Sequence, residues 1–253
     1  MRRLKGVTVL IFLISISWNT HAQEDKGWNF TIAPYLYTPY TSGDIIVEGN
    51  EQDIYSAPSD ILGELKMAGM LYLEAANAKW SVSADVLFLE LGTDFNVPAP
   101  PAPAPVNGDL GADATLLGFY GMYRLADWFE IGAGARINLF DASLKLNSAD
   151  TPPLFPEARF KASDTWVDPV ITYRFTVPIK NEKWHAGMRG DLGGFGVGSD
   201  FAWMIYPYGG YQFSRLFELS LGFRAMGMKY DNDSDLEVDL SLYGPQLGFL
   251  FHL

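Results

Sequence analysis

The chain has 253 residues, of which 48% are hydrophobic and 15% aromatic, so it is not a disordered chain. It contains no cysteine, which excludes a disulfide scaffold, a thiolate metal site and a cysteine nucleophile. With 18 basic against 30 acidic residues the formal net charge is −12, which argues against nucleic acid as a partner.

The N-terminus resembles an export signal in its order of residue types. A basic start, Arg2–Lys5, precedes an apolar run, Val7–Ile16, that is far shorter than the ~18–20 residues of a membrane-spanning helix. Small residues at Thr20 and Ala22 suit a cleavage site before Gln23. The sequence therefore predicts a secretory signal peptide at residues 1–22 and an exported domain at residues 23–253.

From Gly27 onward apolar residues recur at every second position, which is the period of a β-strand. One face of each run is apolar and aromatic, while the other carries glycine, hydroxyl, amide and charged residues. Ten such runs are present, at residues 28–36, 66–74, 81–88, 117–124, 129–139, 168–175, 184–192, 203–213, 218–224 and 243–253. The pattern predicts an all-β protein of about ten strands.

The connections between these runs alternate in length. Tight turns are predicted at 77–79, 125–128, 178–183 and 214–216, and mostly longer loops at 41–64, 93–112, 141–164, 195–200 and 230–236. A soluble sandwich would also alternate its side chains, but short turns at one end and long loops at the other are typical of an up-and-down transmembrane β-barrel.

Aromatic residues follow each predicted tight turn, and the chain ends inside its last strand. Side chains at one level of a barrel form the girdle of a membrane interface. The predicted girdle is Trp28, Trp80, Trp128, Phe129, Trp184 and Phe217.

The last strand carries outward apolar residues at Tyr243, Leu247, Phe249, Phe251 and Leu253. This segment resembles the C-terminal assembly signal of Gram-negative outer-membrane barrels, although such signals usually end in Phe or Trp. The resemblance is to small porin-like outer-membrane β-barrel proteins as a class. It implies insertion from the periplasm by the barrel-assembly machinery, and outer-membrane lipid and lipopolysaccharide as partners.

The charged residues sort by compartment in this topology. The long loops and strand tops hold 20 acidic and 4 basic residues, which we call the acidic crown. Inward positions hold six of each sign. The predicted lumen-lining network comprises Lys66, Glu74, Asp85, Arg124, Glu130, Arg136, Asp168, Arg174, Arg189, Asp191 and Arg224, with Glu218 as the twelfth charge.

This balance leaves two interpretations of the lumen open. It is either filled by paired charges or it is a narrow polar channel, because barrels of about 8 strands hold only side chains and those of 16–18 strands hold water. The acidic crown is likewise either a solvated surface or a site where divalent cations bridge to lipopolysaccharide phosphates.

Three motifs resemble ligand-binding sequences, but each lacks a feature that the corresponding binding site needs or has a simpler structural interpretation. Residues 231–235 imitate the start of a calcium loop, but Leu236 and Leu242 stand where glycine and glutamate are needed, so no metal site is predicted. Residues 193–198 are glycine-rich but open no helix, which favours a hairpin tip over a phosphate loop. The tract Pro98–Pro105 is stiff and extended, either a rigid loop or a protein-binding tip.

No cofactor and no enzyme activity are predicted. His21 leaves with the signal peptide, and His185 and His252 fall near periplasmic strand ends on non-adjacent strands. The leading hypothesis is a porin-like or structural barrel with a largely filled lumen. A surface interaction protein acting through the Pro-Ala tract and acidic loops is the alternative, and an outer-membrane hydrolase is the third.

Overall fold

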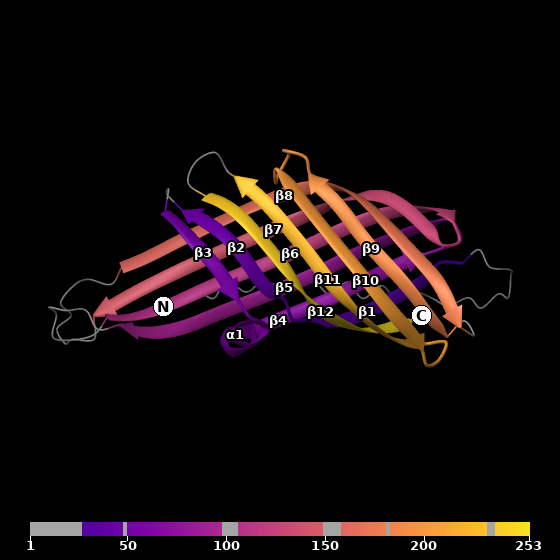
Figure 1. Ribbon diagram of the computed structural model, residues 1–253, viewed down its shortest axis with the longest axis horizontal. Helices are drawn as coiled ribbons and strands as arrows, with labels where there is room; N and C mark the ends of the chain where they lie inside the picture. The colour runs from indigo at the N-terminus through magenta and orange to yellow at the C-terminus, as the bar shows by residue number, and fades with distance from the viewer. Residues whose placement is uncertain (1–26, 48–49, 98–105, 149–157, 181–182, 232–235) are drawn as a thin grey trace, which may run out of the picture.

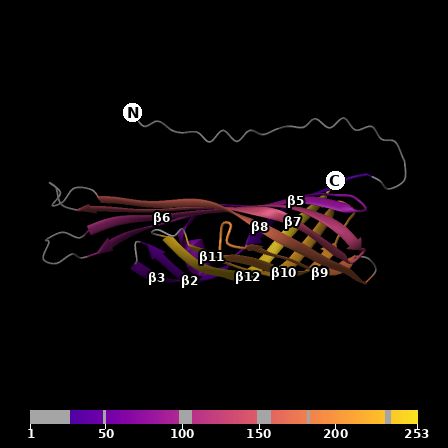
Figure 2. The ribbon, with the colours of Figure 1, turned by 90° about the horizontal axis from the view of Figure 1, so that it is seen from above.

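The computed structural model describes residues 27–47, 50–97, 106–148, 158–180, 183–231 and 236–253. The predicted signal peptide, the Pro98–Pro105 tract and most of the acidic run 231–235 lie outside these ranges. In the described part of the chain, twelve strands form one antiparallel sheet, and ten of them close into a barrel (Figures 1 and 2). The barrel strands are β1 (Asn29–Tyr37), β4 (Leu65–Ala76), β5 (Trp80–Val97), β6 (Val106–Ala126), β7 (Phe129–Ser148), β8 (Ala158–Lys180), β9 (Trp184–Gly194), β10 (Phe201–Gln212), β11 (Phe217–Asp231) and β12 (Leu236–His252).

Each barrel strand pairs with its neighbours in the barrel, and β12 closes the sheet on β1. The closing register joins Thr31 to His252 and Ile32 to Phe251, so the last residues of the chain pair with the first strand. The predicted up-and-down antiparallel barrel of about ten strands is therefore confirmed. Both ends of the barrel domain lie beside the short turns, which is the periplasmic end of such barrels.

Two further strands and a helix occupy the segment 41–64, which the sequence predicted as a loop. β2 (Tyr40–Val47) and β3 (Asn50–Ser56) form a hairpin, and α1 (Pro58–Glu64) connects it to β4. β2 continues the line of β1 along β12, since Tyr37 pairs with Gln246 and Tyr40 with Tyr243. Pro39 falls at the break because it has no N–H to donate to the ladder. The loop prediction was wrong for most of this segment.

Strands β5 to β8 are longer than the predicted runs, because their pairing continues through parts of 93–112 and 141–164. At ~3.3 Å per residue and a tilt of about 40°, about ten residues cross a ~25 Å apolar band. These four strands have 18 to 23 residues, which is more than the band requires. Figure 1 shows them reaching past the other strands at one end of the barrel. The loops were overpredicted because a hairpin that extends beyond the membrane needs no lipid-facing apolar side chains. Its sequence therefore does not show the apolar alternation of a membrane strand.

The outer surface of the barrel is apolar, and the alternation of side chains follows the predicted facing. Leu221 and Phe223 are 61% and 49% exposed, while Ser220 and Arg224, which flank this pair in sequence, are buried. A closed barrel satisfies every backbone group without water, and an apolar exterior requires hydrocarbon around it. The chain is thus an outer-membrane β-barrel.

None of the helical segments in the described residues is long and apolar enough to span a bilayer.

The short turns are formed by local side-chain caps. Asn77 Oδ1 accepts hydrogen bonds from the backbone N–H groups of Lys79 and Trp80, both at 2.8 Å. Ser214 Oγ does the same for Leu216 and Phe217. Such caps satisfy turn N–H groups and hold the next strand's first aromatic residue in place.

The aromatic side chains at this end form cross-strand pairs. The predicted girdle residues contact partners on neighbouring strands as Trp80–Tyr123, Phe129–Phe175, Trp184–Tyr211 and Phe217–Phe251, and Trp128 stacks on Phe129. Trp28 is exposed just before β1. Aromatic pairs of this kind stabilise neighbouring strands as well as suiting an interface.

Candidate functional site

The interior of the barrel divides into three levels. We call them the apolar layer, towards the extracellular end, the central ion pairs, and the periplasmic cavity. All three are formed by inward residues of the alternating strands, so each level draws on strands that are distant in sequence. All predicted network residues except Lys66 lie in the lower two levels or at the edge of the first.

The apolar layer contradicts the prediction of a uniformly polar inner face. Inward side chains here are large and apolar and are almost fully buried, among them Leu87, Leu116, Met204, Met226 and Met228. Trp166 stacks between Phe140 and Tyr230, with ring centroids 5.4 and 3.8 Å away. The strands carry apolar residues on both faces at this height, because lipid lies outside and a packed core inside.

The β9–β10 loop closes against this layer. Ser199 is fully buried, and its backbone N–H and Oγ donate to Asp168 at 2.6 and 3.0 Å. Trp166 Nε1 donates to Ser199 Oγ at 2.8 Å, and Asn138 Nδ2 donates to Asp168 at 2.8 Å. The glycine-rich segment turns through Gly194 and Gly196 at positive φ. It joins two strands and opens no helix, so the hairpin interpretation was correct.

The central ion pairs are centred on Asp85, which is 3% exposed. Arg189 Nη2 donates to it at 2.7 Å and Tyr35 OH at 2.7 Å, while Arg224 Nη2 lies 3.2 Å away. Arg136 bonds Asp191, and both are buried. These strands are not neighbours: β5 and β9 lie on opposite walls of the ten-strand barrel, so the contact between Asp85 and Arg189 crosses the lumen.

A second group of ion pairs lies nearer the periplasm. Glu130 accepts two hydrogen bonds from Arg124, at 2.9 and 2.8 Å, and further bonds from Arg174. Arg174 also bonds Glu74, which accepts a hydrogen bond from Tyr72 at 2.6 Å. The contact between Arg174 on β8 and Glu74 on β4 again crosses the lumen. Most predicted network residues thus pair with one another.

Lys66 and Asp168 depart from that arrangement. A β-bulge between Leu65 and Met67 shifts the register at Lys66, whose exposed side chain lies over Gly92 at the extracellular end. Lys66 is therefore not part of the lumen network. Asp168 is held by the neutral donors of Ser199 and Asn138, although Arg136 is its register partner.

Sequence reasoning missed a cluster of histidines around Glu218. His185 Nε2 lies 3.2 Å from one carboxylate oxygen of Glu218, and His252 Nε2 lies 3.5 Å from the other. Thr31 Oγ1 is 3.1 Å from His252 Nδ1. The histidines are on β9 and β12, as expected, but Glu218 on β11 reaches both. All three residues face inward beside a periplasmic turn. Their similar height in the barrel was the sequence signal that could have predicted the cluster.

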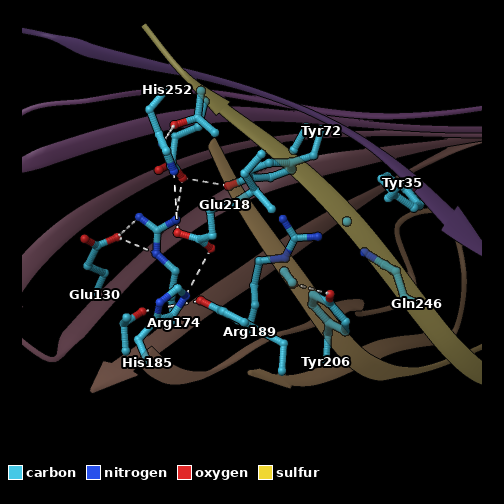
Figure 3. A pocket seen from close by; sticks show the side chains of 18 of the residues that line it. Tyr35, Tyr72, Glu130, Arg174, His185, Arg189, Tyr206, Glu218, Gln246 and His252 are labelled. Carbon is cyan, nitrogen blue, oxygen red and sulfur yellow. Dashed lines mark hydrogen bonds and ion pairs between the residues drawn. The ribbon is translucent and has the colours of Figure 1, made fainter. Parts of the chain in front are cut away.

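Below the central ion pairs the lumen is hollow. A cavity of about 450 Å³ extends to the periplasmic end. Its deep wall includes Tyr35, Tyr72, Arg189 and Gln246, and its mouth includes His252 and Trp128. Figure 3 shows Arg189 between Tyr72 and Tyr206 and the histidine cluster at the other end of the cavity. Arg189 lies over the Tyr72 ring, 4.5 Å from its centroid.

No group of three or more histidine, cysteine or acidic side chains in the described ranges is arranged to hold a metal ion. The C-terminal residues Tyr243, Leu247, Phe249, Phe251 and Leu253 lie on or just after β12 and face outward with the lipid-facing side chains. Their role as an assembly signal remains a prediction.

No protein-family model matches the sequence, and no curated protein matches it. Among solved structures, OmpT, an outer-membrane protease of Escherichia coli, aligns with 90% of this chain and 97% of its own, at 9% identity and a TM-score of 0.44. Ail of Yersinia pestis aligns over 90% and 99%, at 10% identity and TM-score 0.36. The toluene transporter TodX of Pseudomonas putida aligns over 89% of each chain, at 10% identity and TM-score 0.34. With TM-scores below 0.5, none of these similarities assigns a function.

Proposed function

We propose that this chain is a sealed outer-membrane barrel that conducts no ions or solutes and anchors an extracellular sheet formed by the ends of β5 to β8. One observation carries the proposal: the apolar layer fills the lumen with side chains such as Met204 and Met226, 2% and 1% exposed. A water-filled channel cannot pass through close-packed apolar side chains.

The central ion pairs support the same function. Asp85, Arg189 and Arg224 are buried and bonded across the lumen, so an ion would have to separate charges that are already desolvated. Removing one partner of such a pair costs about 3–5 kcal/mol, which makes a resting conduction pathway through this level unfavourable.

A planar-bilayer recording tests the proposal. The refolded protein, confirmed as folded by its heat-modifiable gel mobility, should give no channel steps, while a porin inserted in the same membrane gives them. The variant Met204→Gly with Met226→Gly thins the apolar layer and should show brief openings. Stable, large steps from the wild-type protein would refute the sealed barrel.

A second candidate function is hydrolysis at the periplasmic mouth. Thr31, His252 and Glu218 lie in the order hydroxyl, imidazole, carboxylate, in which a base activates a nucleophile and is itself oriented. Against this role, Thr31 and His252 are direct register partners, so their contact also serves to close the barrel.

A chromogenic-ester assay separates these two roles. Catalysis requires that Thr31→Val abolish ester hydrolysis while the protein still folds. If the wild-type rate equals that of the variant, the contact between Thr31 and His252 serves closure alone.

A further inference from the structure

The buried and half-buried charged side chains of the periplasmic cavity are engaged with protein partners, and the remaining one, Asp127, is exposed beside Trp128 at the mouth. Arg174 is held between Glu74 and Glu130, Arg189 is bonded to Asp85, and Glu218 lies between two histidines. A charged ligand would therefore need to displace an existing ion pair. The cavity offers its free binding capacity in other groups.

Those groups are neutral hydroxyls and an amide. Tyr206 OH and Ser220 Oγ lie 3.2 Å apart, and Tyr208 OH and Thr176 Oγ1 lie 3.4 Å apart. One hydroxyl of each pair donates to the other, so each pair keeps one hydrogen free to donate elsewhere.

Gln246 adds an acceptor to this wall. Its side chain is 5% exposed, it lines the cavity, and its Oε1 has no hydrogen-bond partner. A buried amide oxygen without a partner costs about 1–3 kcal/mol, which a ligand hydroxyl would relieve. The cavity therefore presents neutral donors and a neutral acceptor along one side.

The same side carries flat aromatic faces. The rings of Tyr206 and Tyr208 stack at a centroid distance of 5.2 Å. Glycines make room for them: a Cβ at Gly187 would lie 2.4 Å from the Tyr208 ring, and one at Gly222 would lie 2.6 Å from Tyr206. The neighbouring strands thus have no side chain where the rings lie, which leaves a flat tyrosine wall.

We propose that the periplasmic cavity binds a neutral mono- or disaccharide. Sugar hydroxyls both donate and accept, as the spare groups of Tyr206, Ser220 and Gln246 require, and the C–H face of a sugar ring suits the flat tyrosine wall. The cavity volume of about 450 Å³ falls within the ~300–1,000 Å³ of small-ligand sites. The apolar layer closes the other end, so the sugar enters from the periplasm.

Calorimetric titration of the folded protein, in a detergent without a sugar headgroup, tests this site. The probes are glucose and maltose as neutral ligands, with glucuronate and glucosamine as charged counterparts of the same ring size. We expect the neutral sugars to bind with a Kd in the ~1 mM range or tighter, and the charged sugars at least about ten-fold more weakly.

Two variants and two controls locate the site. Gln246→Leu and Tyr206→Phe each remove one hydrogen-bonding group and should weaken maltose binding about ten-fold. Gln212→Leu and Tyr230→Phe make the same chemical changes outside the cavity and should leave binding unchanged. Heat-modifiable mobility confirms that each variant folds.

Three results would overturn the proposal. They are the absence of heat with either neutral sugar at ~100 mM, stronger binding of a charged sugar, and binding that survives both cavity substitutions. None of these depends on whether the barrel conducts, so the sealed barrel and the sugar site stand or fall separately.

Discussion

The two halves of the lumen are built from the same strands with the same inward alternation, yet they differ in every other respect. On β11, Ser220 lines the hollow periplasmic cavity, and Met226, six residues further on, is packed in the apolar layer. Alternation therefore determines which way a side chain points but does not determine whether its surroundings are wet. That second property comes from what the opposite wall supplies at the same height.

The difference has a functional consequence. A polar lumen throughout would be compatible with a narrow channel. In the barrel that we propose, the apolar layer above the polar cavity closes the lumen to the outside and leaves it open to the periplasm. Ligands would then reach the interior from one side only.

The largest effect should come from placing the same charge in both halves. Met226→Arg puts a guanidinium among apolar side chains where it meets no partner, at a cost of at least about 4 kcal/mol, and should prevent folding. Ser220→Arg places it in the cavity and should leave a folded barrel. Heat-modifiable mobility after refolding measures both, and equal folding yields would show that the two halves are not different environments.

A smaller but still large effect should follow from breaking the central ion pairs. Asp85→Ala leaves Arg189 and Arg224 buried without their carboxylate and should cost about 3–5 kcal/mol in the free energy of unfolding. Arg124→Ala is the matched peripheral change, because that side chain is 34% exposed, and should cost less than about 1 kcal/mol. Urea titration in micelles gives both values. Similar losses of unfolding free energy would mean that the Asp85 and Arg124 ion pairs are equally accessible to water.

A substitution on the outward, lipid-facing surface gives a reference value for the substitutions in the apolar layer and in the central ion pairs. Leu221→Arg puts a charge against hydrocarbon at mid-strand and should cost about 2–4 kcal/mol in the same titration. Leu221→Ala controls for the loss of side-chain volume. A cost no greater than that of Leu221→Ala would mean that this face of β11 does not meet lipid.

The facing of nearly every strand residue could be predicted from sequence, because a closed barrel in lipid imposes a strict period of two. Inward Asp85 and Arg224 and outward Leu221 followed from that rule alone. The apolar layer could have been suspected where the alternation fails, since Val86–Leu89 and Ala225–Met228 are apolar or small at successive positions.

Other features needed the three-dimensional register. Arg174 reaches Glu74, and Asp85 reaches Arg189, across the lumen. The approach of His185 and His252 to Glu218 depends on the register of β9 to β12. The bulge that moves Lys66 out of the lumen is one extra residue, which has no distinct sequence signal. The ends of β5 to β8 were not predicted because they lie outside the runs of regular apolar alternation.

A modest effect should follow from releasing the β9–β10 loop. Ser199→Ala removes a donor to buried Asp168 and the acceptor of Trp166, and should cost about 1–3 kcal/mol. Ser81→Ala offers a comparison, because Ser81 is also buried and its side-chain hydrogen bonds among the described residues are long, at 3.3 Å to Glu130 and 3.4 Å from Arg174. If both substitutions lower the free energy of unfolding equally in urea titration, the contact between Ser199 and Asp168 does not specifically stabilise the closed extracellular half.

The smallest effect should come from the acidic crown, where the carboxylates of Glu90, Asp113 and Asp141 follow one another as register partners across β5, β6 and β7. Like charges directly opposite one another destabilise a sheet by up to about 1 kcal/mol, so Asp113→Asn should stabilise the barrel by about 0.5 kcal/mol in dilute buffer. Added Mg²⁺ should remove most of that gain, because a divalent cation near the row relieves the same repulsion in the wild-type protein and would also attach the crown to lipopolysaccharide phosphates. Urea titrations with Mg²⁺ and with EDTA measure the difference. A gain that is identical in both would mean that the row binds no cations and is only a solvated part of the extracellular sheet.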